Sequence, residues 1–220
     1  MSLPYPKYPI SFTLSKPKRV FSLSADPQIA PLLEVYNYDA AAREADLAAV
    51  DGAEDKVMAQ EKAIGDAQQA TVTVKGAEKN ARAAFGEFRT IGRRLALKGD
   101  AAALRTLGLH QSTPRKRDEF VTTAHTAYQN ALDTPEILAR FVNYGYHEEK
   151  LTGLIAEVET VVEAQAAREA AFGAQQLATQ AQNEALLDVE ERYRKFLVLV
   201  DLAITEPQLK EKLGLLEPSN

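Results

Sequence analysis

Apolar residues recur every three or four positions through most of the chain, which is the spacing of one buried stripe along an α-helix. The clearest series is Leu151, Leu154, Ile155, Val158 and Val162. Alternation of apolar and polar residues, which is typical of a strand, is confined to residues 10–24. The pattern therefore predicts a mostly helical protein with one short β element near the N-terminus.

The alternating segment predicts a small N-terminal β-hairpin arm over residues 1–26. Folding it about its Lys-Pro-Lys-Arg loop places Leu14 opposite Phe21 and Phe12 opposite Leu23. A two-stranded ribbon is only marginally stable alone, so this apolar face is expected to pack on its own bundle or on another chain. The four residues are therefore candidate interaction residues.

The rest of the chain repeats a set of motifs about 106 residues apart. The pair Asn37-Tyr38 matches Asn143-Tyr144, and each half closes with the motif Leu-Gly-Leu. A glycine in such a motif is typical of a helix C-cap, where the backbone takes a left-handed conformation. These matches predict a tandem duplication.

Each half is expected to contain a short helix, a long helical region and a short closing helix. Turn signals near Gly65 and Gly173 are weak, with Thr73 and Thr179 as possible caps, so each long region is either a hairpin or one continuous helix. Matched segment lengths favour the hairpin, and the predicted fold class is an all-α, up-down helical bundle from two tandem-duplicated helical hairpins. The predicted divisions are the arm at 1–26, a first helical repeat at 27–109, a linker with an extra helix at 110–132 and a second helical repeat at 133–220.

Several of these motifs together carry a resemblance to a protein group. The duplicated hairpin, the asparagine near the end of the first short helix, the capping threonine and the closing Leu-Gly-Leu span residues 27–216. They resemble a group of functionally uncharacterised bacterial helical-bundle proteins built from a duplicated helical hairpin. The resemblance implies a fold and a bacterial origin, and it supplies no catalytic residues.

Composition and charge exclude several classes of protein. The chain has no cysteine, which excludes a disulfide scaffold, a thiol nucleophile and a thiolate metal site. A net charge of −5 makes nucleic acid an unlikely partner, although basic runs occur at 16–19 and 114–117. No apolar run approaches the roughly 20 residues that cross a bilayer, and no secretory signal is recognisable. We therefore expect a cytoplasmic protein without a membrane partner.

Motifs for catalysis or for metal binding are missing from the sequence. Its histidines, His110, His125 and His147, form neither a Glu-x-x-His pair nor a His-Glu-x-x-His motif. Phosphate-binding loops and the Gly-x-Ser-x-Gly elbow are also absent. No catalytic residue, metal ligand or cofactor is assigned, and an enzymatic function is disfavoured.

The repeated Asn-Tyr pairs have two interpretations. Asn37 and Asn143 can cap helix ends while Tyr38 and Tyr144 pack their rings, or the four residues line a shared ligand cleft. The missing catalytic set and the apolar arm favour a non-enzymatic protein-interaction or assembly module, with a protein partner or self-association. The alternative is a small-ligand-binding helical bundle, and an enzyme with dispersed residues ranks below both.

Overall fold

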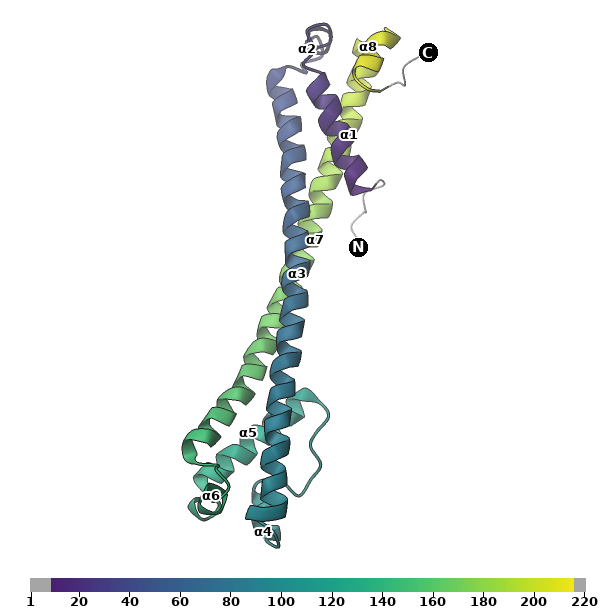
Figure 1. Ribbon diagram of the computed structural model, residues 1–220. Coiled ribbons are helices and arrows are strands. Elements are labelled where there is room, and N and C mark those ends of the chain that lie inside the picture. Colours follow the sequence, from purple (N-terminus) through teal and green to yellow (C-terminus); the bar gives the residue numbers. More distant parts are fainter. Residues whose placement is uncertain (1–8, 216–220) are drawn as a thin grey trace. The chain divides into compact units, whose positions relative to one another are not determined.

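The computed structural model describes residues 9–215, and every regular element within them is a helix (Figure 1). The predicted all-helical core is therefore confirmed. In chain order the elements are α1 (Ile10–Leu23), α2 (Ala30–Glu34), α3 (Ala40–Ile91), the π-helix η1 (Gly92–Ala96), α4 (Ala101–Thr106), α5 (Arg117–Asp133), α6 (Pro135–Val142), α7 (Glu148–Ala203) and α8 (Pro207–Lys212).

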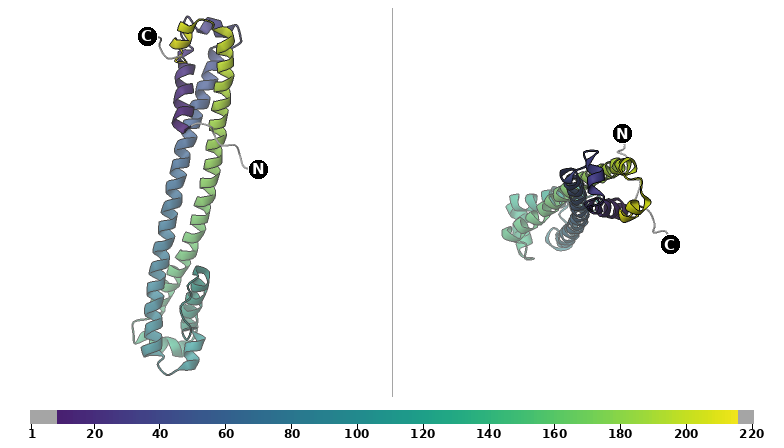
Figure 2. Two further views of the ribbon diagram at one scale, coloured as in Figure 1. Left: turned by 90° about the vertical axis from the view of Figure 1, so that its right-hand side faces the viewer. Right: turned by 90° about the horizontal axis from the view of Figure 1, so that it is seen from above.

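The described chain divides into two compact units. Unit 1 comprises residues 9–64 and 173–215, and unit 2 comprises residues 65–172. Unit 1 therefore contains α1, α2, α8 and one part each of α3 and α7, and Figure 2 shows α1 beside these two long helices. Unit 2 contains η1, α4, α5, α6 and the other parts of α3 and α7. The units cut across the predicted divisions because both long helices contribute to each.

The predicted β-hairpin arm is wrong, because residues 10–23 form helix α1. Residues 1–8 of the predicted arm lie outside the described residues. A spacing of seven puts Leu14 and Phe21 two turns apart on one helical face as readily as it puts them opposite each other in a hairpin. The pattern therefore fitted both structures. The buried residues of α1 follow the helical period and are Thr13, Leu14, Pro17, Val20 and Phe21.

The two predicted helical hairpins are also wrong, because α3 and α7 run without a break through Gly65 and Gly173. A single glycine inside a helix costs about 1 kcal/mol, which a long alanine- and glutamate-rich helix tolerates. Thr73 and Thr179 are not caps. Their hydroxyls donate to the carbonyl oxygens four residues earlier, at 3.0 and 2.9 Å, so both side chains are satisfied within the helix.

Apart from η1, the elements α1 to α4 and α5 to α8 both run as a helix of intermediate length, a short helix, a long helix and a short helix. Buried positions recur as well. Phe21 in α1 corresponds to Tyr128 in α5, 107 residues later, and Leu33 in α2 corresponds to Phe141 in α6, 108 residues later. The register of the buried positions thus differs from the shift of 106 seen at the closing motifs. The tandem duplication itself stays a prediction.

The closing Leu-Gly-Leu motifs are helix C-caps, as predicted. Gly108 and Gly214 have φ angles of 66° and 73°, in the left-handed region that favours glycine. The amide of Leu109 donates to the carbonyl oxygen of Leu104 at 2.9 Å, and Leu215 makes the matching bond at 3.0 Å. This is the six-to-one bond of the Schellman motif, which ends both short helices at a fixed residue.

Each unit has its own core of aromatic and aliphatic side chains. In unit 1, Phe21 meets Phe196 edge to face with ring centroids 5.3 Å apart. In unit 2, Tyr128 meets Phe88 in the same way at 5.0 Å, and Phe88 also stacks on Phe141 at 4.6 Å. The two cores are built alike, with aromatic pairs joining a short helix to a long one.

Candidate functional site

The four candidate residues of the predicted arm do not share one exposed face. Leu14 and Phe21 are buried in the core of unit 1, and Leu23 packs half-buried against that core. Phe12 is 42% exposed and has the Lys16 ammonium group 5.3 Å from its ring centroid. Helix α1 therefore packs on its own unit, which was one of the two arrangements expected for the apolar face.

The four candidate residues of the repeat cleft fall in different units. Asn37 and Tyr38 belong to unit 1, whereas Asn143 and Tyr144 belong to unit 2. Tyr38 is buried and Tyr144 is exposed, so the two tyrosines have different environments. The shared ligand cleft stays a prediction.

The backbone conformation of the two turns that contain these residues gives a different correspondence between the units than the Asn-Tyr match does. Asn37 has a φ of 61°, and the residue with the same left-handed backbone in unit 2 is Gly145, at 80°. The amides of Tyr38 and Tyr146 each donate to a carbonyl oxygen five residues earlier, at 3.2 Å. Asn37-Tyr38 therefore corresponds to Gly145-Tyr146, and a shift of 108 in the sequence would have found the match.

Tyr38 takes part in a polar chain that joins α3 to α7 in unit 1. Its hydroxyl donates to Asp46 at 3.1 Å, and Arg192 donates to both Asp46 and Asp188, at 3.1 and 2.7 Å. Burial, together with the nearby Asp46 carboxylate, raises the pKa of the Tyr38 hydroxyl far above its ordinary value. Asp188 and Asp46 likewise raise the pKa of Arg192. A surface hollow of about 260 Å³ lies beside these linked side chains.

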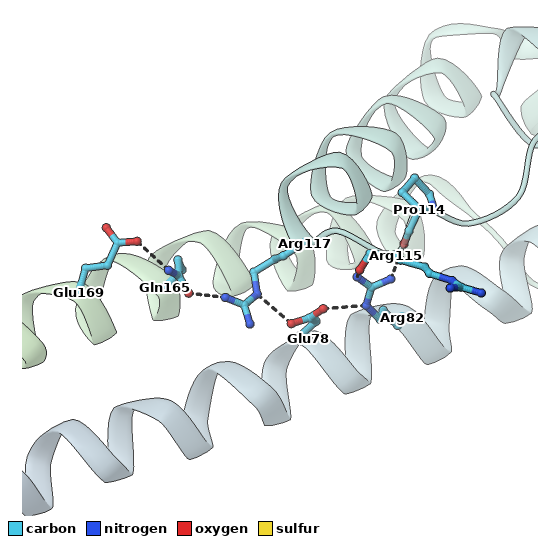
Figure 3. Close-up of polar contacts among 7 residues, drawn as sticks. All are labelled: Glu78, Arg82, Pro114, Arg115, Arg117, Gln165 and Glu169. Carbon is cyan, nitrogen blue, oxygen red and sulfur yellow. Dashed lines mark hydrogen bonds and ion pairs between the residues drawn. The ribbon is translucent and has the colours of Figure 1, made fainter.

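A second polar cluster, in unit 2, centres on Glu78 (Figure 3). Its two carboxylate oxygens accept from the Nε atoms of Arg82 and Arg117, each at 2.8 Å. Burial acts to raise the pKa of Glu78, but the hydrogen bonds and charges of the two guanidinium groups outweigh it and hold the pKa below its usual value. The carboxylate is therefore a fixed link between α3 and the start of α5.

The same cluster holds the segment that leads into α5. Arg82 donates to the carbonyl oxygens of Pro114 and Arg115, at 2.7 and 2.9 Å. Arg117 also donates to Gln165 on α7, as Figure 3 shows. Part of the basic run at 114–117 therefore has a structural role, because Arg117 pairs with the carboxylate of Glu78.

Two tyrosine hydroxyls are buried without a hydrogen-bond partner among residues 9–215, those of Tyr128 and Tyr193. The Tyr128 ring lies edge-on to Phe85 and Phe88, with centroids 5.9 and 5.0 Å away. Burial raises the pKa of Tyr128, and the nearby Tyr146, Glu157 and Glu87 add to the effect. The raised pKa keeps the Tyr128 hydroxyl in its neutral form near neutral pH.

A groove of about 520 Å³ runs between α1, α7 and α8 in unit 1. Its lining mixes apolar side chains with charges of both signs. The lining residues are Phe12, Thr13, Lys16, Pro17, Glu190, Tyr193, Arg194, Leu197, Asp201, Lys210 and Leu215.

A set of exposed apolar side chains lies where α2 meets the end of α7. The Tyr36 hydroxyl donates to the carbonyl oxygen of Leu202 at 3.4 Å, which brings the two segments together. Leu32 lies in α2 and Tyr36 lies in the turn that follows it, and Val198 is one turn before Leu202 on α7. We call this set the α2–α7 surface. Its members are Leu32, Val35, Tyr36, Val198 and Leu202, and they are 36–76% exposed.

Acidic side chains flank the α2–α7 surface. Glu34 and Asp39 follow its residues on one segment, and Glu206 adjoins it on the other, together with Asp201, which pairs with Lys210 at 2.7 Å. Neither residues 26–39 nor residues 201–206 contain a lysine or arginine. The sequence analysis missed this surface. The signal was the run FLVLVDLAI at 196–204, which is apolar on more faces than one buried stripe needs.

Among the described residues, no three histidine or carboxylate side chains are grouped so that they could hold a metal ion. None of the helices within residues 9–215 combines the length and the hydrophobicity that crossing a bilayer requires. No family model, curated protein or solved structure matches the chain.

Proposed function

We propose that the protein is a non-enzymatic protein-interaction module that binds its partner through the α2–α7 surface. The observation that supports this function is the presence of five exposed apolar side chains on two segments that the hydrogen bond from Tyr36 to Leu202 joins. Single exposed apolar residues are ordinary, whereas a contiguous group with a charged rim is typical of a binding surface. Covering a large apolar side chain contributes about 1.5–3 kcal/mol when it becomes fully buried.

The framework beneath the surface favours recognition without rearrangement. Leu33 and Ile204, next to the surface in sequence, are fully buried in the core of unit 1. Lys18 of α1 pairs with Asp51 and Glu54 of α3, at 2.9 and 2.6 Å, and so fixes α1 to the long helix. A binding surface held by such packing loses little conformational entropy when it binds.

A small-ligand-binding bundle has less support. Aromatic side chains fill both cores, and the two hollows described above are partly open to solvent. The tandem duplication belongs to the proposal as well and is supported by the recurring order of helices and buried positions. A cytoplasmic, bacterial setting rests on the sequence alone.

Site-specific photo-crosslinking in cells of the source organism tests the function. A benzophenone amino acid replaces Val35, in the surface, and in a matched control replaces Val72, which is 62% exposed on α3 in unit 2. We expect discrete cross-linked species from position 35 that position 72 does not give. Equal cross-linking at both positions, or none at either, would overturn the proposal.

A further inference from the structure

Unit 2 carries a basic surface at the end of α3 and in η1. Residues 89–98 contain four basic residues and no acidic one. Arg89 and Arg93 lie one turn apart, and burial together with the nearby charge of Arg93 lowers the pKa of Arg89. Arg93, Arg94 and Lys98 form no ion pair with any residue that the structure describes. Leu95, between them, is 52% exposed. We call Arg89, Arg93, Arg94, Leu95 and Lys98 the η1 surface.

Local structure holds the η1 surface in place. Arg89 donates twice to the carbonyl oxygen of Gln111, at 2.6 and 3.2 Å. Gly92 packs so closely that a Cβ atom there would lie 2.7 Å from Leu109. A single π-helical turn such as η1 is also an element that occurs frequently at functional sites. The exposed cations are therefore presented from an ordered helix end.

The η1 surface and the α2–α7 surface occupy corresponding places in the two units, with opposite character. The buried pair Phe88 and Phe196, 108 residues apart, fixes the correspondence. In the same register, Arg93 corresponds to Asp201. Lys98 likewise corresponds to Glu206, and Arg94 to the exposed Leu202. Each cation thus has an acidic or apolar counterpart in the other unit.

From this complementarity we infer that the α2–α7 surface of one copy of the chain docks on the η1 surface of a second copy. The inference rests on the proposed function and names its partner. Pairing two α2–α7 surfaces would bring acidic rims together, and pairing two η1 surfaces would bring arginines together. Joining the unlike surfaces places opposite charges at the rim, with Leu95 against the apolar side chains.

The size of the surfaces predicts a weak and salt-sensitive association. Five partly exposed apolar side chains and their rim cover on the order of 500 Å² on each partner, which is the low end for a specific interface. Exposed charge pairs are screened within about 8–10 Å at physiological salt. We therefore expect raising the salt from 50 to 500 mM to weaken the association about tenfold.

Complementation between two variants of the full chain tests the inference. Leu202→Arg places a cation in the α2–α7 surface and leaves the η1 surface intact. The double variant Arg93→Glu with Arg94→Glu does the reverse. The control is Lys75→Glu with Lys79→Glu, two exposed charge reversals elsewhere on α3. Sedimentation equilibrium measures the mass of each protein over a range of concentrations, at both salt concentrations.

We expect the wild type and the control to associate and each surface variant alone to be a monomer. An equimolar mixture of the two surface variants should form a one-to-one dimer and nothing larger, which also shows that both variants are folded. A monomeric wild type, or a mixture that stays monomeric, overturns the inference. If position 35 then still cross-links to a partner of a different mass, the proposed function stands and only the self-association is wrong. If position 35 gives no cross-linking at all, the proposed function and the self-association are both wrong.

Discussion

Replacing Tyr128 by phenylalanine should make unit 2 more stable. The Tyr128 side chain is fully buried, and its hydroxyl has no hydrogen-bond partner among the described residues. A hydroxyl taken out of water without a partner costs about 1–3 kcal/mol, and Tyr128→Phe removes this cost. The ring contacts with Phe85 and Phe88 stay, because phenylalanine keeps the ring.

The expected gain in the free energy of unfolding is about 1–2 kcal/mol, somewhat less than the full desolvation cost because the lost oxygen leaves a small void. The chain itself shows that phenylalanine suits such a place, since Phe21 stands at the corresponding position in unit 1. For a protein of this size, a gain of 1 kcal/mol raises the melting temperature by about 2–4 °C.

The matched control is Tyr146→Phe in the same core. Burial, followed by the charge and hydrogen bond of Glu87, raises the pKa of Tyr146 to about 12. Because that hydroxyl has a charged partner, its removal should destabilise the protein by about 1–2 kcal/mol. Urea unfolding followed by circular dichroism measures both variants. A loss of stability in Tyr128→Phe would show that its hydroxyl is satisfied, for instance by a buried water molecule, and would refute the reasoning.

Three further variants test the packing and the electrostatics. Phe21→Ala should destabilise unit 1 by about 3–5 kcal/mol in urea unfolding, whereas a loosely attached arm would lose almost nothing. Gly92→Ala should cost about 1–3 kcal/mol, because its Cβ would meet Leu109 at 2.7 Å, and an unchanged midpoint would contradict that contact. Glu78→Gln should cost about 1–3 kcal/mol at pH 7. Since the folded-state pKa of Glu78 is lowered, the wild type should lose this advantage as the pH falls below about 4.5, and parallel pH profiles would argue against it.

The sequence predicted the helical class well and the connections poorly. The apolar stripes of α7 and the Leu-Gly-Leu caps have one structural interpretation each, because their periodicity and their need for a left-handed glycine are local. The turn signals at Gly65 and Gly173 were local too, but weak. A hairpin there would have to offset the loss of helical hydrogen bonds with packing that no short sequence window reveals.

The arm was mispredicted because a strand pattern and a helix pattern coincide in one short segment. Residues 12, 14, 21 and 23 alternate, yet 14 and 21 also fall on one helical face together with Val20 and Pro17. Pro17 lies inside α1, although proline inside a helix removes a backbone hydrogen bond at a cost of about 3 kcal/mol. Burial of Phe21 among Tyr193 and Phe196 offsets that cost, and this tertiary contact was invisible in the sequence.

The α2–α7 surface and the η1 surface become visible only when positions are compared in the correct register. A shift of 106, taken from the closing motifs, aligns Asp201 with Leu95 and hides the opposition of charge. The buried residues of the two long helices give a shift of 108. With that shift, Asp201 aligns with Arg93 and Glu206 aligns with Lys98. Corresponding buried positions are apolar in both units because each core needs apolar side chains there, so packing alone explains that similarity. No such requirement acts on exposed positions. Asp201 is paired with Lys210 in its own unit, so Glu206 and Lys98 are the corresponding opposite charges that recognition between unlike surfaces of two copies would use.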